Sequence, residues 1–276
     1  MAFVELKFFS QMLHTNAQLQ VILPQPGSQS GWDGKTPLPV LYLLHGRGGD
    51  HSDWQRMTSV ERYGEKKPLA MVMMSNLLGE YTNQRYGYPY FDYVSQEVWE
   101  ISHSYFPLSE KREDNFIAGL SMGGYGALKI GLRMPERFSY AAGLSAACDR
   151  YKPLPEEARS IQSIEEFGAK RQMFDRDGYE KAMHFYLNYG SPQEFLNSRE
   201  DNLFLIAEDA AKGNKVLPKL MMICGTEDEW VLPSNRHFHE HLLSLGIPHT
   251  YYESPGAHTW DYWDTEIQRV LEWLPV

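Results

Sequence analysis

One stretch of the chain decides the fold: Asn115-Phe116-Ile117-Ala118-Gly119-Leu120-Ser121-Met122-Gly123-Gly124-Tyr125-Gly126. Its first part is a short apolar run typical of a buried strand, and its last part opens a helical pattern. Between them stands a Gly-x-Ser-x-Gly turn, which exposes a serine hydroxyl above the edge of a sheet when it joins a strand to a helix. The same pentapeptide can also be an ordinary Gly/Ser turn, so the interpretation of Ser121 as a nucleophile depends on the rest of the chain.

Apolar runs of strand length recur along the chain between turn signals. They predict strands at 3–9, 19–23, 39–44, 69–75, 115–120, 138–144, 216–224 and 249–253. Helical patterns fall at 54–63, 91–105, 122–134, 234–245 and 261–273. The first two strands are too close together for a helix between them and should pair antiparallel, whereas the later alternation requires crossover connections. The sequence therefore predicts an α/β protein with a mostly parallel eight-stranded sheet and helices on both faces.

Residues 149–214 break this alternation. The segment shows about two helical patterns and no convincing strand, is rich in charged and aromatic residues, and begins with Pro153 and Pro155. Neither end carries the Gly/Ser-rich linker that would separate a second domain. We therefore expect a single domain over residues 1–276, with residues 149–214 forming a helical cap inserted into it.

Composition excludes several classes of partner. The chain has 276 residues, 26 Lys and Arg against 36 Asp and Glu, and a net charge of -10, which argues against nucleic acid and anionic membranes as partners. No apolar run is long enough to span a membrane, and Glu5 and Lys7 interrupt any signal core. Cys148 and Cys224 lack CxxC spacing and are expected to be buried, reduced thiols. These features favour a cytoplasmic protein.

A serine nucleophile needs a base, and the base needs an orienting carboxylate. In the α/β-hydrolase fold these follow in the order Ser, Asp or Glu, His. Here Asp228 follows the predicted strand 216–224, and His258 lies in a loop after the last strand. Glu227 and Glu229 compete with Asp228, but the shorter side chain holds an imidazole more rigidly. The sequence predicts the triad Ser121, Asp228 and His258 on an α/β-hydrolase fold.

A second loop supplies candidates for the oxyanion hole. The predicted strand 39–44 ends in His45-Gly46-Arg47-Gly48-Gly49-Asp50, where this fold draws one N–H donor, and the residue after the nucleophile supplies the other. We expect the N–H groups of Met122 and Arg47, with Gly46 as the alternative to Arg47. His45 should brace the loop, and the Arg47 side chain either binds a substrate anion or faces solvent.

Aromatic residues near these loops are candidates for the pocket walls. They suggest a small, aromatic-walled acyl pocket, although each is also a plausible packing residue. The candidates are Trp54, Tyr81, Tyr86, Trp230 and Trp260. His237 and His241 share a helix face, but they lack a HExxH pattern and a third ligand, so no metal site is expected.

Taken together, these stretches resemble the esterase D/putative esterase family, and within it the acyl esterases that are similar to tributyrin esterase. The matching residues are 40–49 with Trp54, Gln84-Arg85-Tyr86-Gly87, 111–126, Cys224-Gly225-Thr226-Glu227-Asp228 and Gly256-Ala257-His258-Thr259-Trp260. The resemblance spans nearly the whole chain. It is more specific in the stretch around Ser121 than in the expected cap, residues 149–214.

The resemblance implies a serine carboxylesterase that hydrolyses short-chain acyl esters, from acetyl to butyryl and including acetylated sugars, without a cofactor. A small-molecule ester is then the expected partner, with a homo-oligomer possible. The alternatives are an S-formylglutathione hydrolase or an acyltransferase on the same triad, and a catalytically silent binding protein. Relatives acting on S-formylglutathione carry a Cys soon after the His-Gly pair, where this chain has Arg47-Gly48-Gly49-Asp50, so this alternative is less favoured.

Overall fold

The computed structural model describes residues 1–276 and contains one eight-stranded sheet with the order β1-β2-β4-β3-β5-β6-β7-β8. β1 and β2 pair antiparallel, β2 and β4 also pair antiparallel, and all remaining neighbours are parallel. The strands are β1 (Ala2–Ser10), β2 (Thr15–Leu23), β3 (Val40–Leu44), β4 (Ala70–Met74), β5 (Asn115–Leu120), β6 (Tyr140–Leu144), β7 (Lys219–Gly225) and β8 (His249–Ser254).

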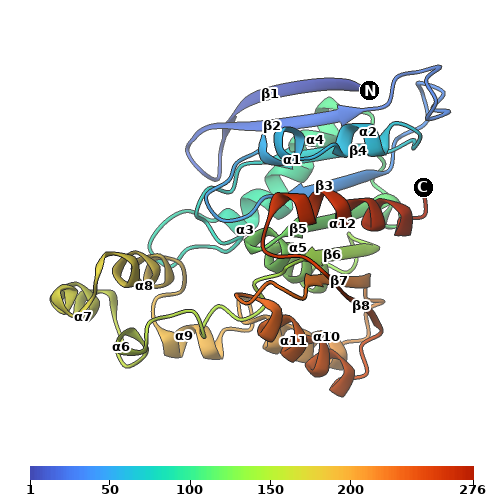
Figure 1. Ribbon diagram of the computed structural model, residues 1–276. Helices are drawn as coiled ribbons and strands as arrows, with labels where there is room; N and C mark the ends of the chain where they lie inside the picture. Colours follow the sequence, from blue (N-terminus) through green and yellow to red (C-terminus); the bar gives the residue numbers. More distant parts are fainter.

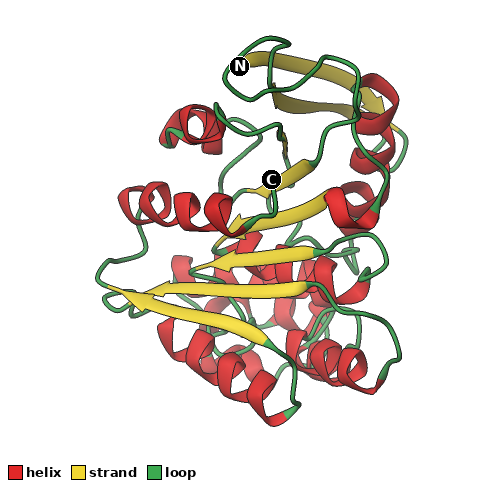
Figure 2. Ribbon diagram, turned by 90° about the vertical axis from the view of Figure 1, so that its right-hand side faces the viewer, coloured by secondary structure: helices red, strands yellow, loops and turns green.

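Helices cover both faces of this sheet (Figures 1 and 2). A larger apolar core joins the sheet to α3 (Tyr90–Asp92), η1 (Tyr93–Glu97), α4 (Val98–Tyr105), α5 (Met122–Arg133), α10 (Leu203–Lys212) and α11 (Leu232–Ser244). A smaller core on the opposite face joins it to α1 (Asp53–Met57), α2 (Val60–Gly64) and α12 (Trp260–Trp273). Strands β3 to β6 are buried along their whole length, as expected for parallel strands covered on both sides.

The predicted α/β-hydrolase fold, with all eight strands and the antiparallel first pair, is confirmed. Two helical predictions differ in detail. The expected helix 54–63 is divided into α1 and α2, and the expected helix 91–105 is divided into α3, the π-helical turn η1 and α4. The seventh strand starts at Lys219 rather than Val216, because Val216 is 76% exposed and Pro218 has no N–H to donate to a neighbouring strand. None of the helices combines the length and apolar character needed to span a bilayer.

The segment expected to form the cap falls into two structural parts. Its first part contains α6 (Glu156–Arg159), α7 (Ile164–Ala169), η3 (Arg171–Met173), α8 (Arg176–Tyr189) and α9 (Pro192–Asn197), and these share an apolar cluster of their own. Its last helix, α10, instead packs against α5 and belongs to the larger core. We therefore use "the cap" for residues 149–197, which project from the carboxyl ends of the strands (Figure 1).

Candidate active site

Ser121 lies at a sharp turn between β5 and α5. Its φ of +53° is in the left-handed region, which costs an ordinary residue free energy and persists only when the surroundings hold it. The flanking glycines allow this turn to pack closely. A Cβ at Gly119 would lie 2.3 Å from the carbonyl oxygen of Gly123, and a Cβ at Gly123 would lie 2.3 Å from that of Leu44. The turn therefore has the geometry of a nucleophile elbow.

Two hydrogen bonds connect Ser121 to a histidine and an aspartate. The Ser121 Oγ lies 2.9 Å from His258 Nε2, and His258 Nδ1 lies 2.6 Å from Asp228 Oδ2. The Asp228 side chain is fully buried, whereas that of His258 is 18% exposed and borders the pocket. If Nδ1 carries the proton and donates it to the carboxylate, Nε2 is free to accept the serine proton. The arrangement can thus act as nucleophile, base and orienting acid.

Among the three candidate acids, the structure brings only Asp228 to the histidine. Glu227 and Glu229 are exposed, while Asp228 is 1% exposed and its backbone carbonyl accepts a hydrogen bond from Leu232 at the start of α11. The neighbouring backbone joins the acid loop to the histidine loop, since the N–H of Glu227 donates to the carbonyl of Gly256. Both loops are therefore held together independently of the imidazole–carboxylate contact.

His45 holds the loop after β3 in place through hydrogen bonds. The N–H of Asn76 donates to His45 Nε2 at 2.8 Å, so Nδ1 carries the proton and donates to the carbonyl of Gly46 at 2.7 Å. The hydroxyl of Tyr81 donates to the His45 carbonyl. Burial lowers the pKa of His45 to about 4, which keeps this ring neutral at physiological pH. The expected bracing role of His45 thus has a clear structural basis.

The backbone N–H groups of Gly46, Arg47 and Met122 have no acceptor within the protein. All three residues border the pocket, and Met122 is the first residue of α5. An N–H at a helix start stabilises negative charge because the aligned peptide dipoles leave partial positive charge there. These groups can therefore hold a developing oxyanion, and both donors considered for the β3 loop, Arg47 and Gly46, stay open.

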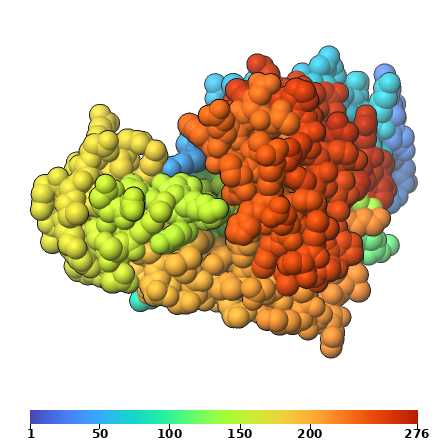
Figure 3. Space-filling view, turned by 60° about the horizontal axis from the view of Figure 1, so that its bottom comes forward, coloured from blue at the N-terminus to red at the C-terminus, as the bar shows by residue number.

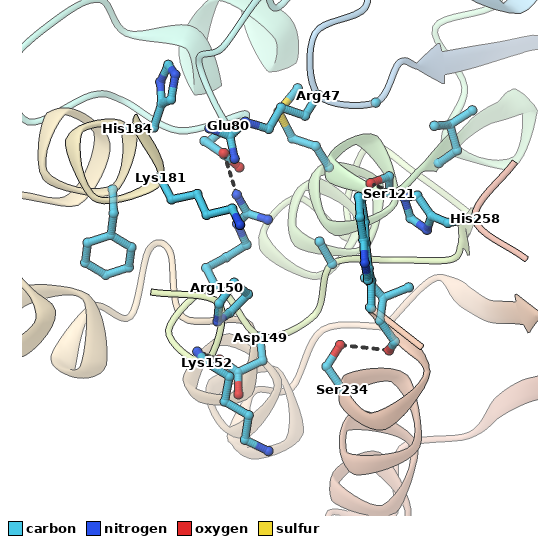
Figure 4. Close-up of a pocket in the computed structure, with 18 of the residues that line it drawn as sticks. Arg47, Glu80, Ser121, Asp149, Arg150, Lys152, Lys181, His184, Ser234 and His258 are labelled. Carbon is cyan, nitrogen blue, oxygen red and sulfur yellow. Dashed lines mark hydrogen bonds and ion pairs between the residues drawn. The ribbon is translucent and has the colours of Figure 1, made fainter. Parts of the chain in front are cut away.

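A pocket of about 890 Å³ opens between Ser121 and the cap. Figure 3 shows the hollow between the cap, in yellow and green, and the body of the molecule, and Figure 4 shows the side chains that line it. The predicted pocket residues Trp230 and Trp260 border it, and the ring of Trp230, 81% exposed, lies 5.6 Å from that of His258 between centroids.

The other three predicted pocket residues are not among those that border it. Trp54 is 1% exposed because its indole N–H donates to the Leu44 carbonyl and its ring packs edge-on against Trp260. Tyr81 is fully buried, and its hydroxyl bonds the His45 carbonyl. Tyr86 is 46% exposed and does not border the pocket. The structure therefore places these three residues outside the lining of this pocket, because adjacency to a site loop does not determine where a side chain lies.

The further charged and titratable residues of the pocket wall were not predicted from the sequence. They come from the start of α1, from the loop between β4 and α3, from the start of the cap and from α8, and they are Asp53, Glu80, Asp149, Arg150, Lys152, Lys181 and His184. The pocket is therefore larger and more polar than the small aromatic one expected. A usable signal existed in the spacing of Lys181, His184 and Phe185, which lie on one face of α8.

Comparison with known proteins identifies similar esterases and serine hydrolases. Residues 10–274 match the family model described as "Putative esterase". The chain is 30% identical to an acetyl esterase from Caldicellulosiruptor saccharolyticus over 99% of this chain and 98% of that one. Among solved structures, it is similar to the fluorophosphonate-binding serine hydrolase FphF of Staphylococcus aureus, at 31% identity and a TM-score of 0.81, covering 99% of this chain and 98% of that one.

A second structure from Staphylococcus aureus is similar to the same degree. It is described as an S-formylglutathione hydrolase, FrmB, with 31% identity, a TM-score of 0.80 and coverage of 99% of this chain and 98% of that chain. A ferulic acid esterase at 20% identity and a TM-score of 0.73 shares the fold. With the family model matching nearly the whole chain, this protein belongs to the putative esterase family and is an ester-hydrolysing enzyme of the α/β-hydrolase fold.

Proposed function

We propose that this enzyme hydrolyses short-chain acyl esters, acetyl esters foremost, with Ser121 as nucleophile, His258 as general base and Asp228 as the residue that orients it. The observation that carries the proposal is the hydrogen-bonded chain from Ser121 Oγ to His258 Nε2 and from His258 Nδ1 to Asp228. The full-length similarity to an acetyl esterase supports the choice of acyl group.

In the first half of the reaction, Ser121 Oγ attacks the ester carbonyl while His258 Nε2 takes the hydroxyl proton. The carbonyl oxygen becomes negatively charged and lies against the N–H groups of Met122 and of Arg47 or Gly46. Collapse of the tetrahedral intermediate breaks the bond to the alcohol oxygen, which receives the proton from His258. The acyl group is left as an ester on Ser121.

In the second half, a water molecule attacks the acyl ester, and His258 takes its proton. A second tetrahedral intermediate forms at the same N–H groups and collapses to release the carboxylic acid. His258 returns the proton to Ser121 Oγ. Buried Asp228 stabilises the imidazolium that forms in each half without itself becoming protonated.

A second candidate reaction is the hydrolysis of a thioester. The observation that favours it is the similarity to FrmB, which equals the similarity to FphF in identity and coverage. The same nucleophile, base and N–H donors suit a thioester, because only the leaving atom changes. The absence of a Cys from Arg47-Gly48-Gly49-Asp50, noted in the sequence, counts against it.

The test combines a substrate series with a trapped intermediate. We expect 4-nitrophenyl acetate and butyrate to be turned over faster than the octanoate, and S-formylglutathione in the same assay measures the second candidate. Ser121→Ala should abolish turnover, whereas Ser244→Ala, an exposed serine at the end of α11, should not change it. A fluorophosphonate should phosphonylate Ser121 Oγ with loss of fluoride, which adds the mass of one phosphonyl group to the protein. Full turnover by Ser121→Ala would refute the proposed mechanism.

A further inference from the structure

Basic side chains gather where the pocket extends beyond Ser121 toward the cap. Arg150, Lys152, Lys181 and His184 border this part of the pocket, and Arg47 lies between His184 and Ser121 in the view of Figure 4. The chain as a whole is acidic, with 36 Asp and Glu against 26 Lys and Arg. The basic character of this wall is thus a local departure from the charge of the molecule.

Much of this positive charge is not neutralised by neighbouring carboxylates. Arg47 and Lys152 take part in none of the ion pairs of the structure. Lys181 pairs with Asp177, whose side chain is 74% exposed and does not border the pocket. Solvent weakens such an exposed pair, so the Lys181 ammonium group can interact with an anion at little cost.

Three carboxylates also border the pocket, and each has other partners or another position. Glu80 pairs with Arg150 at 2.5 Å. Asp149 accepts the backbone N–H groups of Tyr151 and Lys152, at 2.9 and 3.1 Å.

The third carboxylate, Asp53, begins α1 and lies against Gly49 of the loop after β3, where a Cβ on Gly49 would be 1.9 Å from its Oδ2. It therefore lies in the wall formed by that loop. On the side of the pocket that faces the cap, the cationic side chains therefore outnumber the carboxylates.

His184 of α8 also borders this part of the pocket. Burial lowers its pKa, and the positive charges of Arg47 and Arg150 act in the same direction, whereas Glu80 and Glu180 act in the opposite one. The ring therefore lies among charges of both signs. An anion entering this region would meet favourable potential from both Arg47 and the cap.

The volume of the pocket indicates which part of a substrate reaches these side chains. At about 890 Å³ the pocket is comparable to those that hold drug-sized ligands, and an acetyl group fills only a small part of it. With a short acyl group, as in the proposed function, only the alcohol or thiol portion of the substrate is long enough to extend under the cap.

We propose that the natural substrate is an acyl ester or thioester whose leaving group carries a carboxylate or phosphate, bound under the cap by Arg47, Lys152 and Lys181. This inference rests on the proposed function, because it assumes a short acyl group on Ser121. The Arg150–Glu80 pair forms the floor of the anion site and fixes the guanidinium there. Lys152 and Lys181 set the preference for the charged leaving group.

The experiment compares aryl acetates that differ mainly in leaving-group charge. The substrates are 4-acetoxybenzamide, which is neutral, 4-acetoxybenzoate and 4-acetoxyphenyl phosphate. The measured quantity is the ratio of kcat/KM for each anionic ester to that for the neutral one. Intrinsic reactivity differs between these esters, but it cancels when the ratio is compared between enzyme variants. The two anionic esters distinguish a carboxylate site from a phosphate site.

We expect Lys152→Gln/Lys181→Gln to lower at least one of these ratios about tenfold, since each lysine contributes a Coulomb interaction with the anion. The matched control is Lys170→Gln, a cap lysine paired with Glu166 that does not border the pocket, and its ratios should equal those of the wild type. Raising the ionic strength should lower the wild-type ratio more than that of the double variant, in which Arg47 is the remaining unpaired cation.

The inference is overturned if the double variant and the wild type have equal ratios at low ionic strength, or if salt has no effect on the wild-type ratio. It is also overturned if the preference falls instead on an anionic acyl group, measured with a 4-nitrophenyl hemisuccinate against the butyrate. Failure of the proposed mechanism is distinguishable, because it would appear as turnover by Ser121→Ala with any of these esters.

Discussion

Asp228→Asn is the sharpest test of the proposed chemistry. In the wild type, the buried carboxylate accepts a hydrogen bond from His258 Nδ1 at 2.6 Å, which leaves Nε2 unprotonated toward Ser121. An amide of the same shape can donate to Nδ1, so the ring would instead carry its proton on Nε2 and could not accept one from the serine. Loss of the correct tautomer costs a serine hydrolase about 10⁴ in kcat, which corresponds to about 5 kcal/mol in the activation free energy.

The expected effect lies in kcat rather than in KM, because Asp228 does not border the pocket. The assay is steady-state hydrolysis of 4-nitrophenyl acetate, with circular dichroism to confirm that the variant is folded. Glu227→Gln is the matched control: it makes the same chemical change one residue earlier, in an exposed side chain, and should retain full activity. If Asp228→Asn kept more than about a tenth of wild-type kcat, the orienting role of Asp228 would be refuted.

Two further predictions concern stability. Lys129→Met should lower the free energy of unfolding in urea by about 3–5 kcal/mol, because it leaves the largely buried Asp201 carboxylate without its partner at 2.6 Å; Lys215→Met, which breaks an exposed pair, should cost less than about 1 kcal/mol. His45 has a pKa lowered to about 4 in the folded protein, below the unfolded value of 6.5, so its stabilising contribution is complete above pH 6.5 and is lost as the pH falls toward 4. His45→Gln should therefore show a shallower loss of stability over this window, by about 3 kcal/mol, and an equally steep loss in the variant would contradict the assignment.

The strands and the site loops could be predicted because local sequence determines them. β5 and the turn at Ser121 need apolar residues and glycines in one short stretch, and both requirements are visible without a structure. The order of Ser121, Asp228 and His258 likewise follows from where each lies relative to a strand end. The hydrogen bonds then test three positions that local patterns had selected separately.

The pocket could not be predicted in the same way, because its walls come from segments that are distant in sequence. Trp54 and Trp230 both follow site loops, yet one is buried against Leu44 and the other is largely exposed beside His258. What separates them is the direction of the side chain after folding. The same holds for Lys181, which reaches the pocket only because α8 packs within the cap and over the strand ends.

The site residues that local sequence determines and the residues of the pocket wall have different consequences for function. The elbow, the base and the N–H donors suit any acyl group attached to any leaving group, so they account for ester hydrolysis and cannot select a natural substrate. Selection must come from the side chains that contact the rest of the substrate, and we propose that in this protein these include Arg47, Lys152 and Lys181, which border the pocket. A neutral acetylated sugar would leave their charges without a partner, whereas an anionic leaving group would use them. The charge of the pocket wall therefore favours an anionic ester over a neutral one as the natural substrate.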